Sequence, residues 1–211
     1  MSFKGKATTV VSVCAIFLLL AGIAPAFAAT GSTARIKPGP LTINAPGVVN
    51  DFTAGGPVTL SGDIQTLNAT LGNWSISDAT GSGKGWNVTV QASQLTEVLP
   101  DGSAGSLTLP LGSIALSGTR TIAAKNGSST PVSPTGGPLL QNMKSVVDAA
   151  TPVKIIDTQH NYGLGTYNVT EPVNGLTLTL QPKDTLLDAV NYPNGATPFS
   201  TTLTFTVATG P

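Results

Sequence analysis

The stretch DATGSGKGWNVTVQA, Asp78 to Ala92, is the most informative part of this chain. A Gly/Ser-rich turn, Gly81 to Gly85, leads into Trp86, after which apolar and polar side chains alternate strictly as far as Ala92. Period-two alternation with β-branched and aromatic residues is typical of a half-buried strand. A tryptophan that opens such a strand is either a core anchor or part of a binding face, and the difference decides the function.

Similar runs recur along the chain at the even spacing of a sandwich or barrel. Trp74–Ser77 and Trp86–Ala92 flank the Gly/Ser turn and are predicted to form a hairpin. The connections between most runs are too short for crossover helices, which favours antiparallel pairing. We therefore predict an all-β fold: a single antiparallel β-sandwich domain, Greek-key-like, with at most one short helix. The other predicted strands are Leu41–Ile43, Val58–Leu60, Ile64–Leu71, Leu107–Leu109, Ile114–Leu116, Arg120–Ala124, Val153–Ile156, the run through Tyr167 and Val169, Leu176–Leu180 and Leu203–Val207.

The one candidate helix follows a loop rich in proline and glycine, residues 126–138. Leu139, Leu140, Met143, Val146 and Val147 lie at the spacing of an amphipathic helix. A bent edge segment accounts for the same residues equally well.

The N-terminal part is predicted to be a targeting segment. Lys4 and Lys6 precede an apolar run, and Ala26-Phe27-Ala28 has the small-x-small pattern of a signal-peptidase site. We predict a signal peptide over residues 1–28, a flexible leader over 29–40 and the β-sandwich domain over 41–211. The expected location is therefore outside the cell, with no membrane attachment once the signal peptide is removed.

Composition excludes several functional classes. Without Lys4 and Lys6 the mature chain has 8 basic and 10 acidic residues, a net charge of 8 − 10 = −2, so it lacks the basic surface that nucleic-acid binding needs. The only cysteine, Cys14, lies in the predicted signal peptide, and the mature chain therefore has no disulfide or thiolate chemistry.

Catalytic and metal-binding motifs are absent from the sequence. There is no G-x-S-x-G, no H-E-x-x-H and no Cys/His metal spacing, and the one histidine, His160, lies in a turn-rich run. The acidic residues are scattered singly, mostly beside turn formers. We expect no enzymatic activity, no cofactor and no metal.

Aromatic residues are few, so their positions carry information. Trp74, Trp86 and Phe205 either fill the sandwich core or stack against sugar rings, and the alternation favours the core.

Three segments of the chain resemble the WxL domain of Gram-positive cell-surface proteins. Asp78 with the Gly-rich turn and Gly85-Trp86-Asn87-Val88 is similar to the proximal motif, and Gly163-Leu164-Gly165-Thr166-Tyr167 is similar to the family's G-x-G-x-Y element. The terminal run from Ser200 to Pro211 takes the place of the distal motif. The chain departs from the family's pattern at two points: Val88 stands for the leucine of the first motif, and Phe205-x-Val207 replaces the second tryptophan.

The resemblance implies an exported protein that attaches non-covalently to the cell wall, with peptidoglycan or another wall polymer as its ligand and other surface proteins as partners. Binding is then expected at the faces presented by Trp86 and the Phe205 strand, together with the Gly81–Gly85 loop. The candidate ligand-binding residues are Trp74, Asp78, Trp86, Val88, Phe205 and Val207.

A structural role is the alternative. The same export signal and β-rich composition suit a subunit of a surface filament or layer that assembles by β-strand addition at sheet edges.

Overall fold

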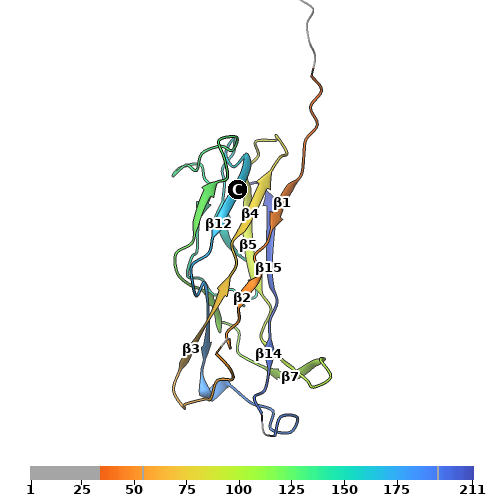
Figure 1. Ribbon diagram of the computed structural model, residues 1–211, viewed down its shortest axis with the longest axis vertical. Coiled ribbons are helices and arrows are strands. Elements are labelled where there is room, and N and C mark those ends of the chain that lie inside the picture. The colour runs from red at the N-terminus through yellow and green to blue at the C-terminus, as the bar shows by residue number, and fades with distance from the viewer. Residues whose placement is uncertain (1–33, 54, 194) are drawn as a thin grey trace, which may run out of the picture. The chain divides into compact units, whose positions relative to one another are not determined.

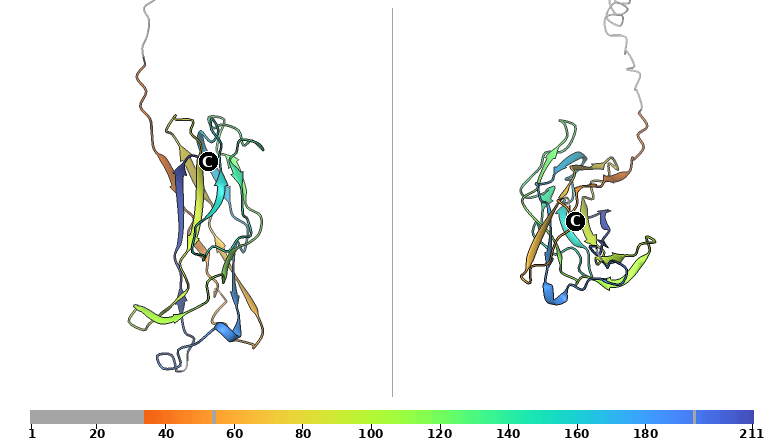
Figure 2. Two further views of the ribbon diagram at one scale, coloured as in Figure 1. Left: turned by 180° about the vertical axis from the view of Figure 1, so that it is seen from behind. Right: turned by 60° about the horizontal axis from the view of Figure 1, so that its bottom comes forward.

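The computed structural model describes residues 34–53, 55–193 and 195–211, and the strands belong to a folded unit that extends from Pro38 to Pro211. Every strand pair within it is antiparallel, and the only helical element among the described residues is a short 3₁₀ turn, η1 (Pro182–Asp184). The strands form an all-β, sandwich-like body with two layers (Figures 1 and 2), which confirms the predicted fold class.

Each layer is built in two tiers along the strand direction. We call the tier that holds the C-terminus the apical tier and the other the distal tier (Figure 1). The first layer has the order β1-β4-β12-β9 in the apical tier and β2-β3-β13-β8 in the distal tier. Its strands are β1 (Leu41–Asn44), β2 (Val48–Asn50), β3 (Gln65–Leu71), β4 (Trp74–Asp78), β8 (Ile114–Leu116), β9 (Thr121–Ala124), β12 (Gly165–Thr170) and β13 (Leu176–Leu180).

The second layer repeats this arrangement with fewer strands. Its apical sheet has the order β10-β11-β5-β15, and its distal sheet has the order β14-β6-β7. Strands far apart in the chain become neighbours in it, as β5 and β15 do. The strands are β5 (Trp86–Ala92), β6 (Thr96–Val98), β7 (Ala104–Thr108), β10 (Leu139–Leu140), β11 (Val153–Asp157), β14 (Phe199–Ser200) and β15 (Leu203–Thr209).

Aromatic side chains join the two layers in the apical tier. The ring of Trp74 on β4 lies 5.5 Å from that of Phe205 on β15, and the ring of Trp86 on β5 lies 5.9 Å from that of Tyr167 on β12. Both pairs are tilted, an arrangement that adds electrostatic attraction to the burial of apolar area. Aromatic side chains therefore fill the space between β4 and β12 of one layer and β5 and β15 of the other.

The predicted hairpin between Trp74–Ser77 and Trp86–Ala92 is wrong. Both strands form, but β4 pairs with β1 and β12, whereas β5 pairs with β11 and β15. Each strand carries an apolar face, and burying both faces against each other requires the strands to lie in opposite layers. The Gly-rich loop between them therefore crosses from one layer to the other.

The candidate helix over residues 139–147 is also absent. Leu139–Leu140 forms β10, and Asn142 has a φ of 47°, which a right-handed helix does not allow. Further on, the carbonyl oxygen of Ser145 accepts the N–H of Leu116, and that of Val147 accepts the N–H of Ala92. This segment therefore bridges the two layers as a bent edge, the alternative that the sequence left open.

One predicted boundary and several strands differ from the structure. The folded unit begins at Pro38, inside the predicted leader, because Gly39 donates a 2.8 Å hydrogen bond to the carbonyl of Ala79 and Pro40 accepts one from Ala79. Val58–Leu60 is not a strand, whereas β2, β6, β10 and β14 form without having been predicted. The predicted signal peptide, residues 1–28, lies outside the described residues.

Candidate functional site

Asp78 shapes the Gly-rich loop at the apical end. It is the last residue of β4, only 4% exposed, and one of its carboxylate oxygens accepts hydrogen bonds from the N–H and the hydroxyl of Thr80, at 2.9 and 2.7 Å. The hydroxyl of Thr80 lies 2.9 Å from that of Ser82, whose side chain accepts the N–H of Lys84 at 3.3 Å. These contacts hold the loop in one conformation, so Asp78 caps a turn rather than facing a ligand.

Trp86 is completely buried at the end of this loop. Its indole Nε1 donates a 2.8 Å hydrogen bond to the carbonyl of Gly163, and its main-chain N–H donates to the hydroxyl of Thr158 at 2.6 Å. Gly163 has a φ of 78°, and a Cβ atom at this position would collide with the indole nitrogen. Residue 163 must therefore be glycine for the indole N–H to reach the carbonyl oxygen of this residue.

The indole of Trp86 packs on Tyr167, the last residue of the G-x-G-x-Y element. Tyr167 is buried, and its hydroxyl donates to the carbonyl of Thr130 at 2.6 Å. Burial raises the pKa of Tyr167 above its usual value, a hydrogen bond from Thr130 opposes this, and the nearby Asp78 carboxylate adds to it. The phenol consequently stays neutral and acts as a packing and hydrogen-bonding group.

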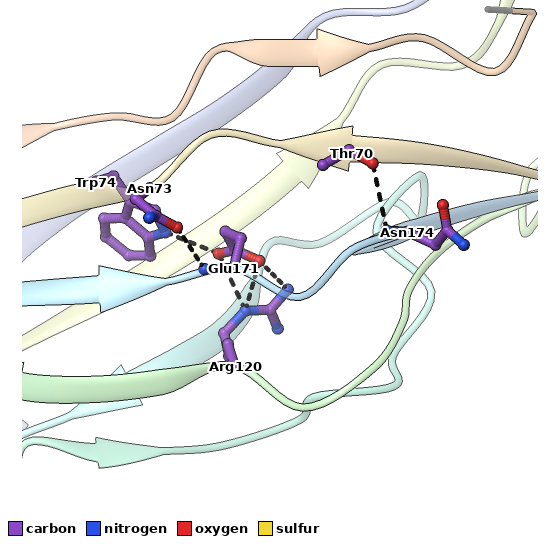
Figure 3. A network of polar contacts seen from close by, with 6 residues as sticks. All are labelled: Thr70, Asn73, Trp74, Arg120, Glu171 and Asn174. Carbon is purple, nitrogen blue, oxygen red and sulfur yellow. Dashed lines mark hydrogen bonds and ion pairs between the residues drawn. The ribbon is translucent and has the colours of Figure 1, made fainter.

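Trp74 lies at the junction of the two tiers of the first layer, in a buried polar network (Figure 3). Its indole N–H donates to the carboxylate of Glu171 at 2.7 Å, and that carboxylate also pairs with Arg120 at 3.0 Å. The side chains of the ion pair are 1% and 0% exposed. The side-chain oxygen of Asn73 accepts the N–H of Glu171 at 3.0 Å. This hydrogen bond joins the link between β3 and β4 to the link between β12 and β13.

Val88, Phe205 and Val207 complete the predicted set. Val88 is fully buried on β5, and Val207 lies opposite it on β15. Phe205 lies opposite Val90, and both β15 side chains are half-buried and packed against the core.

The six predicted ligand-binding residues therefore belong to the core or its margin. Four of them, Trp74, Asp78, Trp86 and Val88, are buried to 4% exposure or less. Neither tryptophan presents a ring face to solvent, so neither can stack on a sugar in this structure. Both tryptophans are therefore core residues, as the alternation favoured. The expectation that their indoles contact a wall polymer directly does not agree with their burial.

The three segments that resemble the WxL domain meet at the apical end. Trp86 is bonded to Gly163 as described, and Gly210 donates a 3.0 Å hydrogen bond to the carbonyl of Gly85. The side chain of Asn87 donates to the carbonyl of Gly210 at 2.8 Å. Two segments that are distant in the sequence are thus hydrogen-bonded to the run Gly85–Asn87 at this end.

The solvent-exposed side chains at this end form a polar surface, of which the sequence singled out only the part in the Gly81–Gly85 loop. The loop of Ser82 and Lys84 lies beside the loop of Gln159, His160 and Asn161, because Asn161 donates a 2.7 Å hydrogen bond to the carbonyl of Gly83. These five side chains are exposed, and we call them the apical surface. For the loop of Gln159, His160 and Asn161, the only signal in the sequence was a run of turn residues between two predicted strands.

An apolar cavity occupies the distal tier. Its volume is about 560 Å³, within the range of small-molecule sites. Its apolar walls come from both layers and from the segments that precede β3 and β14, and they include Phe52, Val58, Leu60, Leu67, Leu95, Leu109, Leu178, Leu180, Leu187 and Phe199. The sequence offered no sign of this cavity, and Val58 and Leu60, predicted as strand residues, line it.

Among the described residues, no group of three or more His, Cys, Asp or Glu side chains is arranged to hold a metal ion. The same part of the chain contains no helix with the length and hydropathy required to cross a membrane.

Comparison of the chain with family models, with curated proteins and with solved structures found no significant match. The similarity to the WxL domain thus rests on the three short segments alone.

Proposed function

We propose that this protein is exported and attaches non-covalently to the bacterial cell wall, with the apical end of the sandwich as its binding region. The observation that carries the proposal is the meeting of the three WxL-like segments there, through the Trp86–Gly163 and Gly85–Gly210 hydrogen bonds. The buried tryptophan and glycines then serve to hold the apical loops in place, and the exposed side chains of those loops contact the polymer.

The chemistry of the apical surface suits a wall polymer. Ser82, Gln159 and Asn161 offer neutral donors and acceptors to the hydroxyl and amide groups of amino sugars and short peptides. Lys84 offers a cation to a peptide carboxylate, and His160 offers a ring face as well as nitrogen atoms. Such a surface favours binding by many weak polar contacts, without catalysis, and leaves the rest of the sandwich free for other surface proteins.

Sedimentation with purified peptidoglycan tests this proposal. We expect the protein to pellet with Gram-positive sacculi and the double variant Lys84→Ala/His160→Ala to bind at least about fivefold more weakly, because both side chains are exposed at the apical end. The matched control is Gln181→Ala/Lys183→Ala, which removes one cation and one polar side chain beyond β13 in the distal tier. A protein that stays in the supernatant, or equal losses in the two double variants, would contradict the proposal.

Trp86→Ala is unsuitable as a binding variant. The burial of Trp86 means that its removal unfolds or loosens the apical end, and lost binding would then report lost structure.

The alternative, a subunit assembled by strand addition, is favoured by one observation. Strand β2 forms the edge of its sheet in the distal tier, with Val48 53% and Val49 64% exposed. An apolar edge strand with free main-chain groups can pair with another chain. If it does, size-exclusion chromatography shows oligomers that the Val49→Lys variant abolishes, whereas a monomer at high concentration rejects this alternative.

A further inference from the structure

Glu97 is a buried carboxyl group with one oxygen left without a partner. It lies on β6, is 2% exposed, and its Oε2 accepts an N–H from Leu107 at 3.3 Å, whereas its Oε1 has no hydrogen-bond partner among the described residues. The opposite strand makes room for this carboxyl group with Gly105, where a Cβ atom would overlap it. Buried polar atoms are almost always paired in native proteins, so an orphaned carboxylate oxygen requires an explanation.

A second carboxyl group, Asp188, lies in the segment between η1 and β14, which runs beside β6. Its main-chain N–H donates to the hydroxyl of Thr197 at 2.8 Å, the next residue, Pro198, accepts the N–H of Val98 at 2.9 Å, and Phe199 pairs with Glu97. The Oδ1 of Asp188 accepts the N–H groups of Val190 and Asn191, each at 2.9 Å. The main-chain and side-chain hydrogen bonds from Asn191 lower the pKa of Asp188, so this carboxyl group is ionised at neutral pH. An interaction with Glu97 is also among the causes that lower the pKa of Asp188.

No side-chain cation compensates the pair. The ion pairs of the described residues join Arg120 to Glu171, Lys154 to Asp157 and Lys183 to Asp184, and none reaches Glu97 or Asp188. Two carboxyl groups this close repel each other unless a proton or a cation lies between them.

We propose that Glu97 and Asp188 together bind a divalent cation, Ca²⁺. Both ligands are hard oxygen donors, which Ca²⁺ prefers, and its flexible coordination accepts two side chains with water and main-chain oxygens in the other positions. The orphaned Oε1 of Glu97 supplies the buried ligand, and Asp188 supplies the second.

The proposed cation site lies next to the wall of the distal cavity. Asp188 is followed by the segment that lines the distal cavity, and its N–H donates a 2.8 Å hydrogen bond to Thr197, a cavity residue. Leu187, on its other side, also lines the cavity. A cation between β6 and this segment therefore holds one wall of the cavity in place.

Thermal unfolding of the purified protein with CaCl₂ or with EDTA tests the proposal. We expect Ca²⁺ to raise the Tm by about 5 °C when its concentration is about 100-fold above the Kd, because only the folded state brings the two ligands together. The isosteric variant Glu97→Gln should lose this shift. The control is Asp101→Asn in the β6–β7 turn, whose carboxylate is already bonded to Ser103 and which should keep the full shift.

Three outcomes would overturn the proposal: a wild-type Tm that ignores Ca²⁺, a Glu97→Gln variant that keeps the shift, or stabilisation by a fall from pH 7 to pH 5 in place of a response to Ca²⁺, which would indicate a shared proton. If Glu97→Gln does not fold, Asp188→Asn takes its place. Calorimetric titration with CaCl₂ should then show heat of binding for the wild type and none for that variant.

Discussion

The two tiers of the sandwich share the same layers but are filled differently. In the apical tier two aromatic pairs, Trp74–Phe205 and Trp86–Tyr167, fill the space between the layers. In the distal tier the facing residues are mostly leucines, such as Leu67, and a cavity of about 560 Å³ lies between the layers.

Alternation of apolar and polar residues therefore does not by itself ensure that the space between two sheets is filled. Strands β5 and β13 both alternate buried and half-exposed residues, yet the two aromatic pairs lie in the tier of β5, whereas Phe52 and Phe199 of the distal tier line the cavity. The buried Arg120–Glu171 pair lies where the two tiers meet. We therefore expect the apical tier to supply most of the stability and the distal tier to tolerate change.

Removal of Trp86 should cause the largest loss. We expect Trp86→Ala to lower the free energy of unfolding by about 3–5 kcal/mol, because it opens a cavity in a closely packed core. Chemical denaturation measures this. Trp86→Phe, which keeps a ring but loses the bond to Gly163, should cost less, and a Trp86→Ala loss below about 1 kcal/mol would show that the apical tier is not the stable one.

Breaking the ion pair between the tiers should come next. Glu171→Gln keeps an acceptor for Trp74 but leaves the Arg120 cation buried without its counter-charge, which we expect to cost about 3 kcal/mol. The exposed pair of Lys183 and Asp184 provides the control, because Lys183→Ala should change stability by less than about 1 kcal/mol. Similar values for the two variants in urea denaturation would mean that burial of the Arg120–Glu171 pair has no special weight.

Enlarging a core side chain should affect stability differently in the two tiers. Val90→Phe enlarges a fully buried residue of the apical core and should cost about 1–3 kcal/mol. Leu67→Phe enlarges a residue on the cavity wall, where space exists, and we expect a change within about 0.5 kcal/mol. Equal destabilisation of the two variants, measured by thermal melts, would mean that the distal cavity is not available to side chains.

Alkaline pH should produce the smallest effect. Because burial raises the pKa of Tyr167 in the folded state, its neutral form is favoured there, and the stability it contributes is complete below pH 10.0, the usual value, and declines as the pH rises through the folded pKa. The stability difference between the wild type and Tyr167→Phe should thus be constant to about pH 10 and fall above it. A difference that grows above pH 10 in denaturation experiments would reverse the assigned sign.

Sequence reasoning succeeded where alternation was regular. Trp86–Ala92 and Ile114–Leu116 are strands with the predicted bounds, since alternating burial follows from the backbone of a strand. It missed β2, whose three residues are all exposed, and β6, whose one buried residue is the charged Glu97, because neither has an apolar inward face. The predicted helix failed because the left-handed Asn142 and the hydrogen bonds needed by other strands override a spacing of apolar residues.

The candidate site was predicted only in part. The chosen segments do meet, but four of the six chosen side chains are buried. Of the exposed side chains, Lys84 lies in the Gly81–Gly85 loop that was expected to bind, whereas His160 was not selected. The cavity and the orphaned carboxylate of Glu97 could not be predicted, because both depend on which strands face each other across the layers.

By itself, the order of residues determined that strands would form, that they would be half-buried, and that glycines would stand at the turns. These properties are local, because side-chain alternation and positive φ angles involve only neighbouring residues. The tertiary structure alone decided that β4 and β5 lie in opposite layers, that both indoles face inward, and that one tier is filled while the other is hollow. Those outcomes depend on the total volume that distant strands bring together, which no single stretch of sequence contains.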